Sequence, residues 1–242
     1  MKKLIFKKEI NSTNTYLKEN YNCFEHFTIC YTNHQTKGKG RISHNWYDEK
    51  GKNLLMSILL KDVELNNYLN DLTLVVAVAV YKVLEKYISN ITIKWPNDIY
   101  VNGLKICGIL TEGVTLNNQI EAIIVGIGLN VNGTIYPEDI RNNTTSLKLL
   151  TSKTYNRKRL LKEIVKTLEY ELDLLKQNNK SYLGVIRDHF YLLNKTINYD
   201  KEGTIYSGIV LGIDDDGKLI VEVDGIKEYL FTGEVTLKKK EE

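Results

Sequence analysis

Cysteine is scarce in this chain of 242 residues and carries no spacing pattern. Its three cysteines, Cys23, Cys30 and Cys107, form no CxxC pair, so the sequence indicates neither a disulfide framework nor a zinc site. The longest apolar run, residues 74–81, is too short to span a bilayer. The N-terminal residues 1–8 lack the apolar core of a signal peptide. We therefore expect a protein of the reducing cytoplasm with no membrane segment.

Strong charge of either sign is also lacking. The net charge is only +3, which gives no strong attraction to nucleic acids or acidic membranes. No Walker A spacing and no GxGxxG motif occur in the chain. Arginine is found at five positions, so Arg41 stands out because it lies in a glycine-rich loop. The length suits one large domain, or one domain with a small addition.

Hydrophobic periodicity predicts alternating strands and helices before residue 193. We expect strands at residues 5–10, 27–32, 54–60, 91–95, 99–101, 104–112 and 122–129, and helices at residues 13–20, 66–88, 160–175 and 181–193. Residues 11–14, Asn-Ser-Thr-Asn, offer N-capping side chains to the first helix. The last fifty residues predict short strands at 196–199, 204–213, 218–223 and 226–231. This change of character predicts a small β-barrel and a domain boundary at Leu193/Asn194.

A glycine-rich loop at residues 35–46 reads QTKGKGRISHNW. Gly38 and Gly40 let backbone N–H groups approach an anion closely, and Lys39 and Arg41 add positive charge. Trp46 offers a ring face for stacking a base. Taken alone, such a loop is more often a solvated surface loop.

The most informative segment is KWPND at residues 94–98, followed by KICGIL at residues 105–110. The proline ends a strand and fixes where Asn97 and Asp98 emerge. A carboxylate there suits Mg²⁺ bound to phosphate oxygens, because hard cations prefer oxygen ligands. Lys105 is placed to offset charge between a carboxylate and a phosphate. The segment predicts a site for a polyphosphate beside a small acid; the alternative is a polar turn with surface lysines.

A third motif, GIGLNVN, spans residues 126–132 at the end of an apolar strand. Its glycines leave room for a ligand against the sheet, and the Asn130 amide is suited to a phosphate or a ribose. Glycine at a strand end is also ordinary turn chemistry, so this motif is weak by itself.

Together, the three motifs resemble the biotin–protein ligase family over nearly the whole chain. Ser-Thr-Asn at residues 12–14, the glycine loop, KWPND with KICGIL, and GIGLN match the family's motifs in their order. The resemblance is to the short form, without an N-terminal DNA-binding domain. It implies an α+β fold: a mixed β-sheet with helices packed on it, of the class II synthetase-like type, and a small C-terminal SH3-like β-barrel. The implied domains are 1–193, catalytic, and 194–242.

The resemblance also implies site residues. Catalytic roles fall to Arg41, Lys105 and Asp98, and Asp98 would also hold a phosphate-bound Mg²⁺. The implied biotin site comprises Ser12, Thr13, Asn14, Gln35, Gly38, Lys39, Arg41, Lys105 and Gly108. The implied nucleotide site comprises Arg41, Trp46, Lys94, Asn97, Asp98, Lys105 and Asn130, with Trp46 stacked on adenine. The histidines, His44 included, lack the spacing of a general base and are expected at the surface.

The implied reaction has two steps and needs ATP, Mg²⁺ and biotin. Biotin's carboxylate attacks the α-phosphorus, giving biotinyl-5′-AMP, and a lysine of a biotin carboxyl carrier protein or domain then takes the acyl group. No protein nucleophile is required, which agrees with the lack of a Ser-His or Cys-His arrangement. The catalytic work is positioning and charge neutralisation.

The glycine loop departs from the family pattern at four positions. Lys39 replaces an arginine, keeping the charge but losing the bidentate fork, and Ile42, Ser43 and His44 replace the later Arg-Gly-Arg. The chain starts eleven residues before Ser12, so we expect no DNA-binding domain and no DNA binding. A homodimer is left open by the sequence.

Two alternatives are weighed against this interpretation. Lipoate–protein ligases share the general architecture, but KWPND and the Gly-Ile-Leu after Lys105 favour biotin. The small β-domain with lysines at residues 238–240 is also compatible with a nucleic-acid-binding module, although lysines followed by two glutamates are typical of a solvated terminus.

Overall fold

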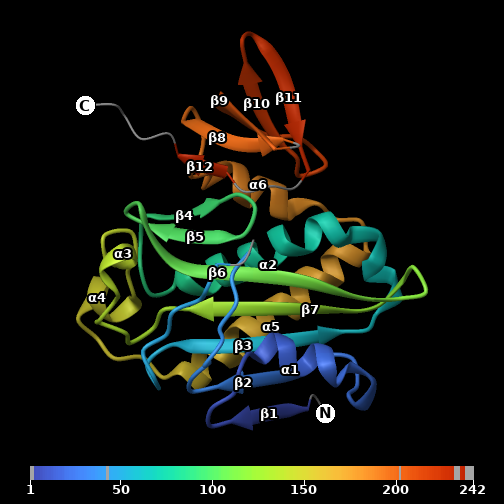
Figure 1. The fold of residues 1–242 in the computed structure, drawn as a ribbon, viewed down its shortest axis with the longest axis vertical. Coiled ribbons are helices and arrows are strands. Elements are labelled where there is room, and N and C mark those ends of the chain that lie inside the picture. Colours follow the sequence, from blue (N-terminus) through green and yellow to red (C-terminus); the bar gives the residue numbers. More distant parts are fainter. Residues whose placement is uncertain (1–2, 42–43, 202, 232–234, 238–242) are drawn as a thin grey trace.

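The computed structural model describes residues 3–41, 44–201, 203–231 and 235–237 (Figure 1). Its main part is a seven-stranded sheet in the order β1-β2-β3-β7-β6-β5-β4. The strands are β1 (Leu4–Lys7), β2 (Thr28–Thr32), β3 (Leu54–Leu60), β4 (Ile91–Lys94), β5 (Asp98–Val101), β6 (Leu104–Leu116) and β7 (Gln119–Leu129). β1 and β2 pair in parallel and the other neighbours are antiparallel. The expected mixed sheet with packed helices is therefore confirmed.

Helices cover both faces of this sheet. α2 (Leu69–Leu84) and α5 (Arg157–Lys176) pack on one face, and α1 (Thr13–Glu19) packs on the other (Figure 1). Alternation along β3 sends Met56 and Ile58 into the large core under α2 and α5, and Leu59 into a smaller core with Leu17 of α1. The remaining helices are η1 (Tyr21–Cys23), η2 (Val63–Tyr68), α3 (Glu138–Arg141), α4 (Leu147–Thr151) and α6 (Ser181–Asp188).

The segment Val63–Leu84, which joins η2 to α2, is the one stretch of the described residues that is long and apolar enough to cross a membrane. Its mean hydropathy is 1.2, and 61% of the apolar window is buried inside the fold. A core helix meets the same criteria, and α2 packs against both the sheet and α5. Its apolar character is therefore explained by core packing.

Several predicted elements differ from the observed ones at their ends. α2 begins at Leu69, because residues 63–68 form the short helix η2. α6 ends at Asp188, before the expected residue 193, because the next residues pair with β4. There, Ile93 N donates to His189 O and Tyr191 N donates to Ile93 O. The short helices α3 and α4 were not predicted.

On the face of the sheet that α1 covers, two rows of residues run across neighbouring strands. They form a floor on this face. The first row joins Ser57, Gly126 and Leu110 on β3, β7 and β6. The second row joins Gly128, Gly108 and Asp98 on β7, β6 and β5. Because residues directly opposite each other share a face, the three glycines leave this face open between bulkier neighbours.

The C-terminal part is a five-stranded antiparallel sheet in the order β11-β10-β9-β8-β12. Its strands are β8 (Thr196–Lys201), β9 (Thr204–Ile213), β10 (Leu219–Val223), β11 (Ile226–Leu230) and β12 (Val235–Leu237). The expected SH3-like strands are present, but the described sheet is open and not a closed barrel. β12 has three residues and pairs only with β8, and β11 pairs only with β10, so the order has two ends.

The two sheets meet at Trp95. Its side chain is 2% exposed, and its indole N–H donates to Gly217 O over 2.9 Å. Figure 1 shows the second sheet above the β4 and β5 edge of the main sheet. Trp95 therefore anchors the C-terminal sheet. Asn97 and Asp98, which follow it in the KWPND motif, line a pocket to which Trp95 also contributes.

Candidate active site

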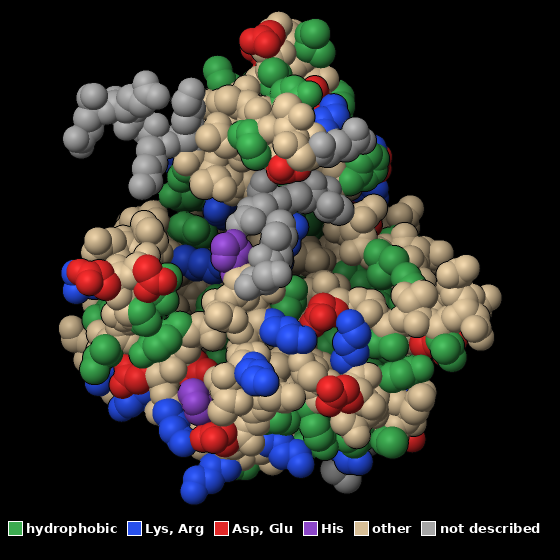
Figure 2. All heavy atoms as spheres, viewed as in Figure 1, with side chains coloured by type: hydrophobic (Ala, Val, Ile, Leu, Met, Phe, Trp, Pro, Cys, Tyr) green, Lys and Arg blue, Asp and Glu red, His purple; other side chains and the backbone are tan. Residues whose placement is uncertain are grey.

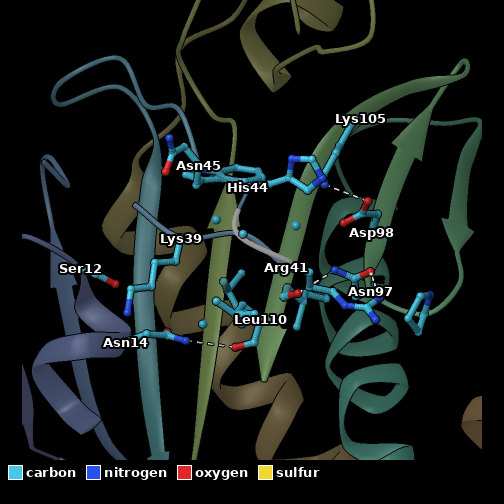
Figure 3. Close-up of a pocket in the computed structure, with 18 of the residues that line it drawn as sticks. Ser12, Asn14, Lys39, Arg41, His44, Asn45, Asn97, Asp98, Lys105 and Leu110 are labelled. Carbon is cyan, nitrogen blue, oxygen red and sulfur yellow. Dashed lines mark hydrogen bonds and ion pairs between the residues drawn. The ribbon is translucent and has the colours of Figure 1, made fainter. Parts of the chain in front are cut away.

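One pocket of about 220 Å³ lies between the N-terminus of α1, residues 39–41 and 44–46 of the glycine loop, and the floor of β5, β6 and β7 (Figure 3). It brings together twelve of the predicted site residues: Ser12, Thr13, Asn14, Gln35, Lys39, Arg41, Trp46, Lys94, Asn97, Asp98, Lys105 and Gly108. Val235 of the C-terminal sheet also lines it. Residues separated by more than two hundred positions thus share one cavity.

The α1 end of the pocket is rich in uncharged hydrogen-bonding groups, and the Lys39 side chain points toward it (Figure 3). Ser12 caps α1, and its hydroxyl accepts from Thr15 N over 3.4 Å. Thr13 N donates to Gln35 Oε1 over 2.8 Å, and Thr13 Oγ1 lies 3.0 Å from the same oxygen. The Asn14 amide turns away from this pair toward β3 and β6. These groups can hold an uncharged polar ring.

The glycine loop folds back on itself as a narrow hairpin. Trp46 N donates to Gly38 O over 2.9 Å, and Gly40 N donates to His44 O over 2.7 Å. The Gly40 N–H is therefore engaged within the loop, which corrects the expectation that it is available to an anion. Gly38 is buried and does not line the pocket. It packs so closely against the other side of the loop that a Cβ there would lie 2.6 Å from Trp46 O. Ile42 and Ser43 lie outside the described residues.

Trp46 lies flat against the glycine floor. A Cβ on Gly108 would lie 2.7 Å from the indole ring, and a Cβ on Gly128 would lie 2.6 Å from it. The sequence predicted room for a ligand at Gly126 and Gly128, whereas in the structure the room at Gly128, like that at Gly108, is taken by Trp46. Among the described residues the buried Trp46 Nε1 has no hydrogen-bond partner. The ring therefore forms a platform with one polar atom left for a ligand.

The opposite end of the pocket is cationic. Lys105 Nζ lies 2.8 Å from Asp98 Oδ2 and 5.6 Å from the Trp46 ring centroid. Arg41 Nη1 donates to Asn97 Oδ1 over 3.2 Å, and Asn97 Nδ2 donates to Ile109 O over 2.9 Å. Asn97 thus orients the guanidinium over the floor, as Figure 3 shows.

Positive charge dominates the lining. Lys39, Arg41, Lys94 and Lys105 line the pocket, and among the described residues Asp98 is the one carboxylate in the lining. Figure 2 shows Lys and Arg side chains around the hollow below the C-terminal sheet. In a partly desolvated cavity, unlike in open water, such a surplus attracts a polyphosphate strongly.

The described residues contain no group of three His, Cys, Asp or Glu side chains that could hold a metal ion by themselves. Asp98 Oδ1 is nevertheless a buried carboxylate oxygen without a hydrogen-bond partner in that part of the chain. A single free carboxylate oxygen fits Mg²⁺ carried on phosphates, because this ion keeps several waters and takes one or two protein carboxylates.

Asn130 follows β7 and is 2% exposed, and it does not line the pocket. Its Oδ1 has no partner within the described chain. The sequence interpretation also missed His44, Asn45 and Val235, which line the pocket. His44 is exposed, as expected, but its place in the lining depends on the loop hairpin. No local pattern marks Val235, since only the packing of the two sheets brings it there.

Residues 6–130 match the Biotin/lipoate A/B protein ligase family, and residues 192–238 match the Biotin protein ligase C terminal domain. The chain belongs to the biotin/lipoate protein ligase family. The strings that predicted this, KWPND with KICGIL, lie inside the matched segment.

Relatives within this ligase family cover much of the chain. The bifunctional ligase/repressor BirA of Bacillus subtilis is 32% identical over 221 residues, which are 87% of this chain and 66% of that protein. The biotin–[acetyl-CoA-carboxylase] ligase of Mycobacterium tuberculosis is 27% identical and covers 84% of this chain and 76% of its own length. This chain thus spans about two thirds of the length of the BirA proteins that it matches.

A solved biotin protein ligase from Aquifex aeolicus, in complex with biotin and ATP, superposes with a TM-score of 0.88. The two chains are 30% identical, and the match covers 99% of this chain and all of the other. The ligase fold therefore extends through both sheets.

Proposed function

We propose that this protein is an ATP-dependent ligase that activates biotin as biotinyl-5′-AMP and transfers the biotinyl group to a lysine of a biotin carboxyl carrier protein or domain. One observation carries the proposal: uncharged hydrogen-bonding groups at one end and the cations Arg41 and Lys105 at the other meet in a single pocket. The first suits the ureido ring of biotin, and the second suits the phosphates of ATP. The names of the relatives, which include biotin ligases, support the same substrates.

In the first step a carboxylate oxygen of biotin bonds to the α-phosphorus, and the bond from that phosphorus to the bridging oxygen breaks and releases pyrophosphate. Arg41 and Lys105 are the proposed catalytic residues, because two anions must approach each other and both cations line the pocket. Their effect is about 1 kcal/mol in water and several times larger in a shielded site. Mg²⁺ held on the phosphates beside Asp98 would neutralise further charge.

In the second step the amine of the acceptor lysine bonds to the acyl carbon, and the bond to the phosphate oxygen breaks. AMP leaves and the amine loses a proton. The residues of this chain need only hold the adenylate and exclude water. The glycine loop, with Lys39 and Arg41, is the proposed cover over the adenylate.

The proposal also covers the nucleotide-binding residues, the domain boundary, the cellular compartment and DNA binding. Trp46 would stack on adenine, with Lys94, Asn97 and Asn130 on the nucleotide side. The proposed domain boundary lies between Leu193 and Asn194; the end of α6 at Asp188 and the start of β8 at Thr196 support it. The free cysteines support a reducing compartment, the cytoplasm. That the protein does not bind DNA stays a prediction for a filter-binding assay at physiological salt.

The experiment that tests the function is ATP–pyrophosphate exchange with biotin and with lipoate, measured separately and in competition. We expect exchange with biotin and little with lipoate. Radiolabelled biotin should then pass to a carrier domain, and a carrier whose acceptor lysine is replaced should stay unlabelled. Exchange that depends on lipoate alone would contradict the proposal.

A further inference from the structure

A continuous hydrogen-bonded path of four side chains lies at the α1 end of the pocket. It consists of Glu112, Asn14, Ser57 and Thr13. Ser57 of β3 is fully buried, and its Oγ lies 2.6 Å from Thr13 Oγ1 and 2.5 Å from Asn14 Oδ1. Asn14 Nδ2 donates to Glu112 Oε2 over 2.8 Å. It also donates to Leu110 O over 3.3 Å (Figure 3). The path therefore runs from a carboxylate on β6 to the hydroxyl of Thr13.

The orientation of the Asn14 amide follows from its neighbours. A carboxylate and a backbone carbonyl only accept hydrogen bonds, so the amide nitrogen must face Glu112 and Leu110. Asn14 Oδ1 then faces Ser57 as an acceptor. Gly126 makes this possible, because a Cβ there would overlap the Asn14 amide. Lys18 Nζ lies 3.6 Å from Glu112 Oε1 and balances its charge.

Counting hydroxyl protons then fixes the direction of the path. Three oxygen–oxygen contacts occur in series: Asn14 to Ser57, Ser57 to Thr13, and Thr13 to Gln35 at 3.0 Å. Only Ser57 and Thr13 carry a proton, so one contact has none. The two shorter contacts, 2.5 and 2.6 Å, require protons. Ser57 therefore donates to Asn14, and Thr13 donates to Ser57.

This assignment leaves Thr13 Oγ1 and Gln35 Oε1 3.0 Å apart with lone pairs on both. Gln35 Oε1 is held in this orientation because it accepts the Thr13 backbone N–H. Two acceptors that converge on the pocket are complementary to an N–H donor of a ligand. The ureido ring of biotin carries such donors.

We propose that Ser57 and Glu112, acting through Asn14, are positioning residues that turn the Thr13 hydroxyl into an acceptor and so select a ligand with an N–H group at this point. The inference rests on the proposed function, because it deepens the recognition of biotin. Ser57 and Glu112 themselves do not line the pocket.

The test compares biotin with its two cyclic carbamate analogues, in which one or the other ureido N–H is replaced by a ring oxygen. Affinity is measured by isothermal titration without ATP. Wild-type protein should discriminate against one of the two carbamates by about tenfold or more, the effect of leaving buried acceptors without a donor.

Ser57→Ala frees the Thr13 proton to point at Gln35, so the tenfold preference for the urea should fall toward one. Ser146→Ala is the matched control, because Ser146 is equally buried and donates to Gly133 O far from Thr13. It should lower the melting temperature and leave the preference unchanged.

A second pair of variants avoids the buried serine. Glu112→Leu removes the charged acceptor that orients Asn14 and should also reduce the preference, while Glu112→Gln keeps an acceptor and should retain it. A folded Ser57→Ala or Glu112→Leu protein that weakens urea and carbamate equally would overturn the inference. If wild-type protein binds no biotin, the proposed function fails as well, which separates the two failures.

Discussion

The ammonium of Lys105 lies 2.8 Å from the carboxylate of Asp98, at the end of the glycine floor on which Trp46 rests. The two residues lie on the paired strands β5 and β6, next to a register shift at Ile99 and Tyr100. Asp98 therefore holds the lysine over the platform before any ligand is bound. An anionic phosphate that reaches Lys105 must share it with Asp98, and Mg²⁺ on the phosphate would compensate that carboxylate.

Lys105→Ala should lower the rate of biotinyl-adenylate formation by about two orders of magnitude or more, the usual effect of losing one transition-state donor. Pyrophosphate exchange measures this rate. Lys82→Ala is the control, because Lys82 also makes a short ion pair, 2.6 Å from Glu171, with a side chain as exposed as that of Lys105. It should reduce stability and keep the rate. Wild-type exchange in Lys105→Ala would refute the catalytic role.

Arg41→Ala should produce a similar loss, about two orders of magnitude in adenylate formation. The guanidinium is oriented by Asn97, so Asn97→Ala is expected to have a smaller effect in the same direction. Arg141→Ala, which removes an exposed arginine paired with Glu138, should leave the exchange rate unchanged. Equal rates in Arg41→Ala and Arg141→Ala would show that the loop arginine only lies near the reaction.

Much of the fold and most site residues could be predicted because their signals are local. The apolar run of β3 gave its bounds at Leu54–Leu60, and the order of KWPND and KICGIL placed Asn97, Asp98 and Lys105 in one pocket. Alternation predicts that Gly126 and Gly128, two residues apart, share a face. These features depend on neighbours in the sequence.

The rest could not be predicted because it depends on distant packing. Nothing near Gly128 indicates that an indole from residue 46 covers it, and Ser57 looks like one more small residue in an apolar strand. The open C-terminal sheet is likewise a matter of which strands pair, and strand lengths alone did not reveal it. Pairings across the sheet decide all three features.

The stability of the protein should fall as the pH drops through about 6.5 because of His26. The His26 side chain is exposed, but partial desolvation of its ring lowers the pKa below 6.5; Asp62 opposes this shift and Lys176 adds to it. The unfolded chain therefore takes up a proton first, so stability is full above pH 6.5 and declines below it.

The neutral form is also required structurally, since His26 Nδ1 accepts from Lys61 N over 3.0 Å. His26→Gln can keep that acceptor but cannot titrate. Urea unfolding between pH 5 and 7.5, a range on either side of the ordinary pKa of histidine, should show a shallower fall for the variant. Parallel curves for the two proteins would contradict the prediction.

Gly128→Ala should weaken ATP binding by displacing Trp46. The new methyl group would lie 2.6 Å from the indole, which is a rigid ring held by its own hairpin, so the platform must tilt or lift. We expect the KM for ATP to rise about tenfold, the usual scale for base–aromatic stacking, while kcat changes less.

Gly113→Ala is the matched control in the neighbouring strand β6, because nothing lies within 4 Å of a Cβ there. Steady-state exchange at varied ATP measures both variants, and ATP quenching of tryptophan fluorescence reports the ring itself. If Gly128→Ala and Gly113→Ala bind ATP equally well, the glycine floor does not set the position of Trp46 for the nucleotide.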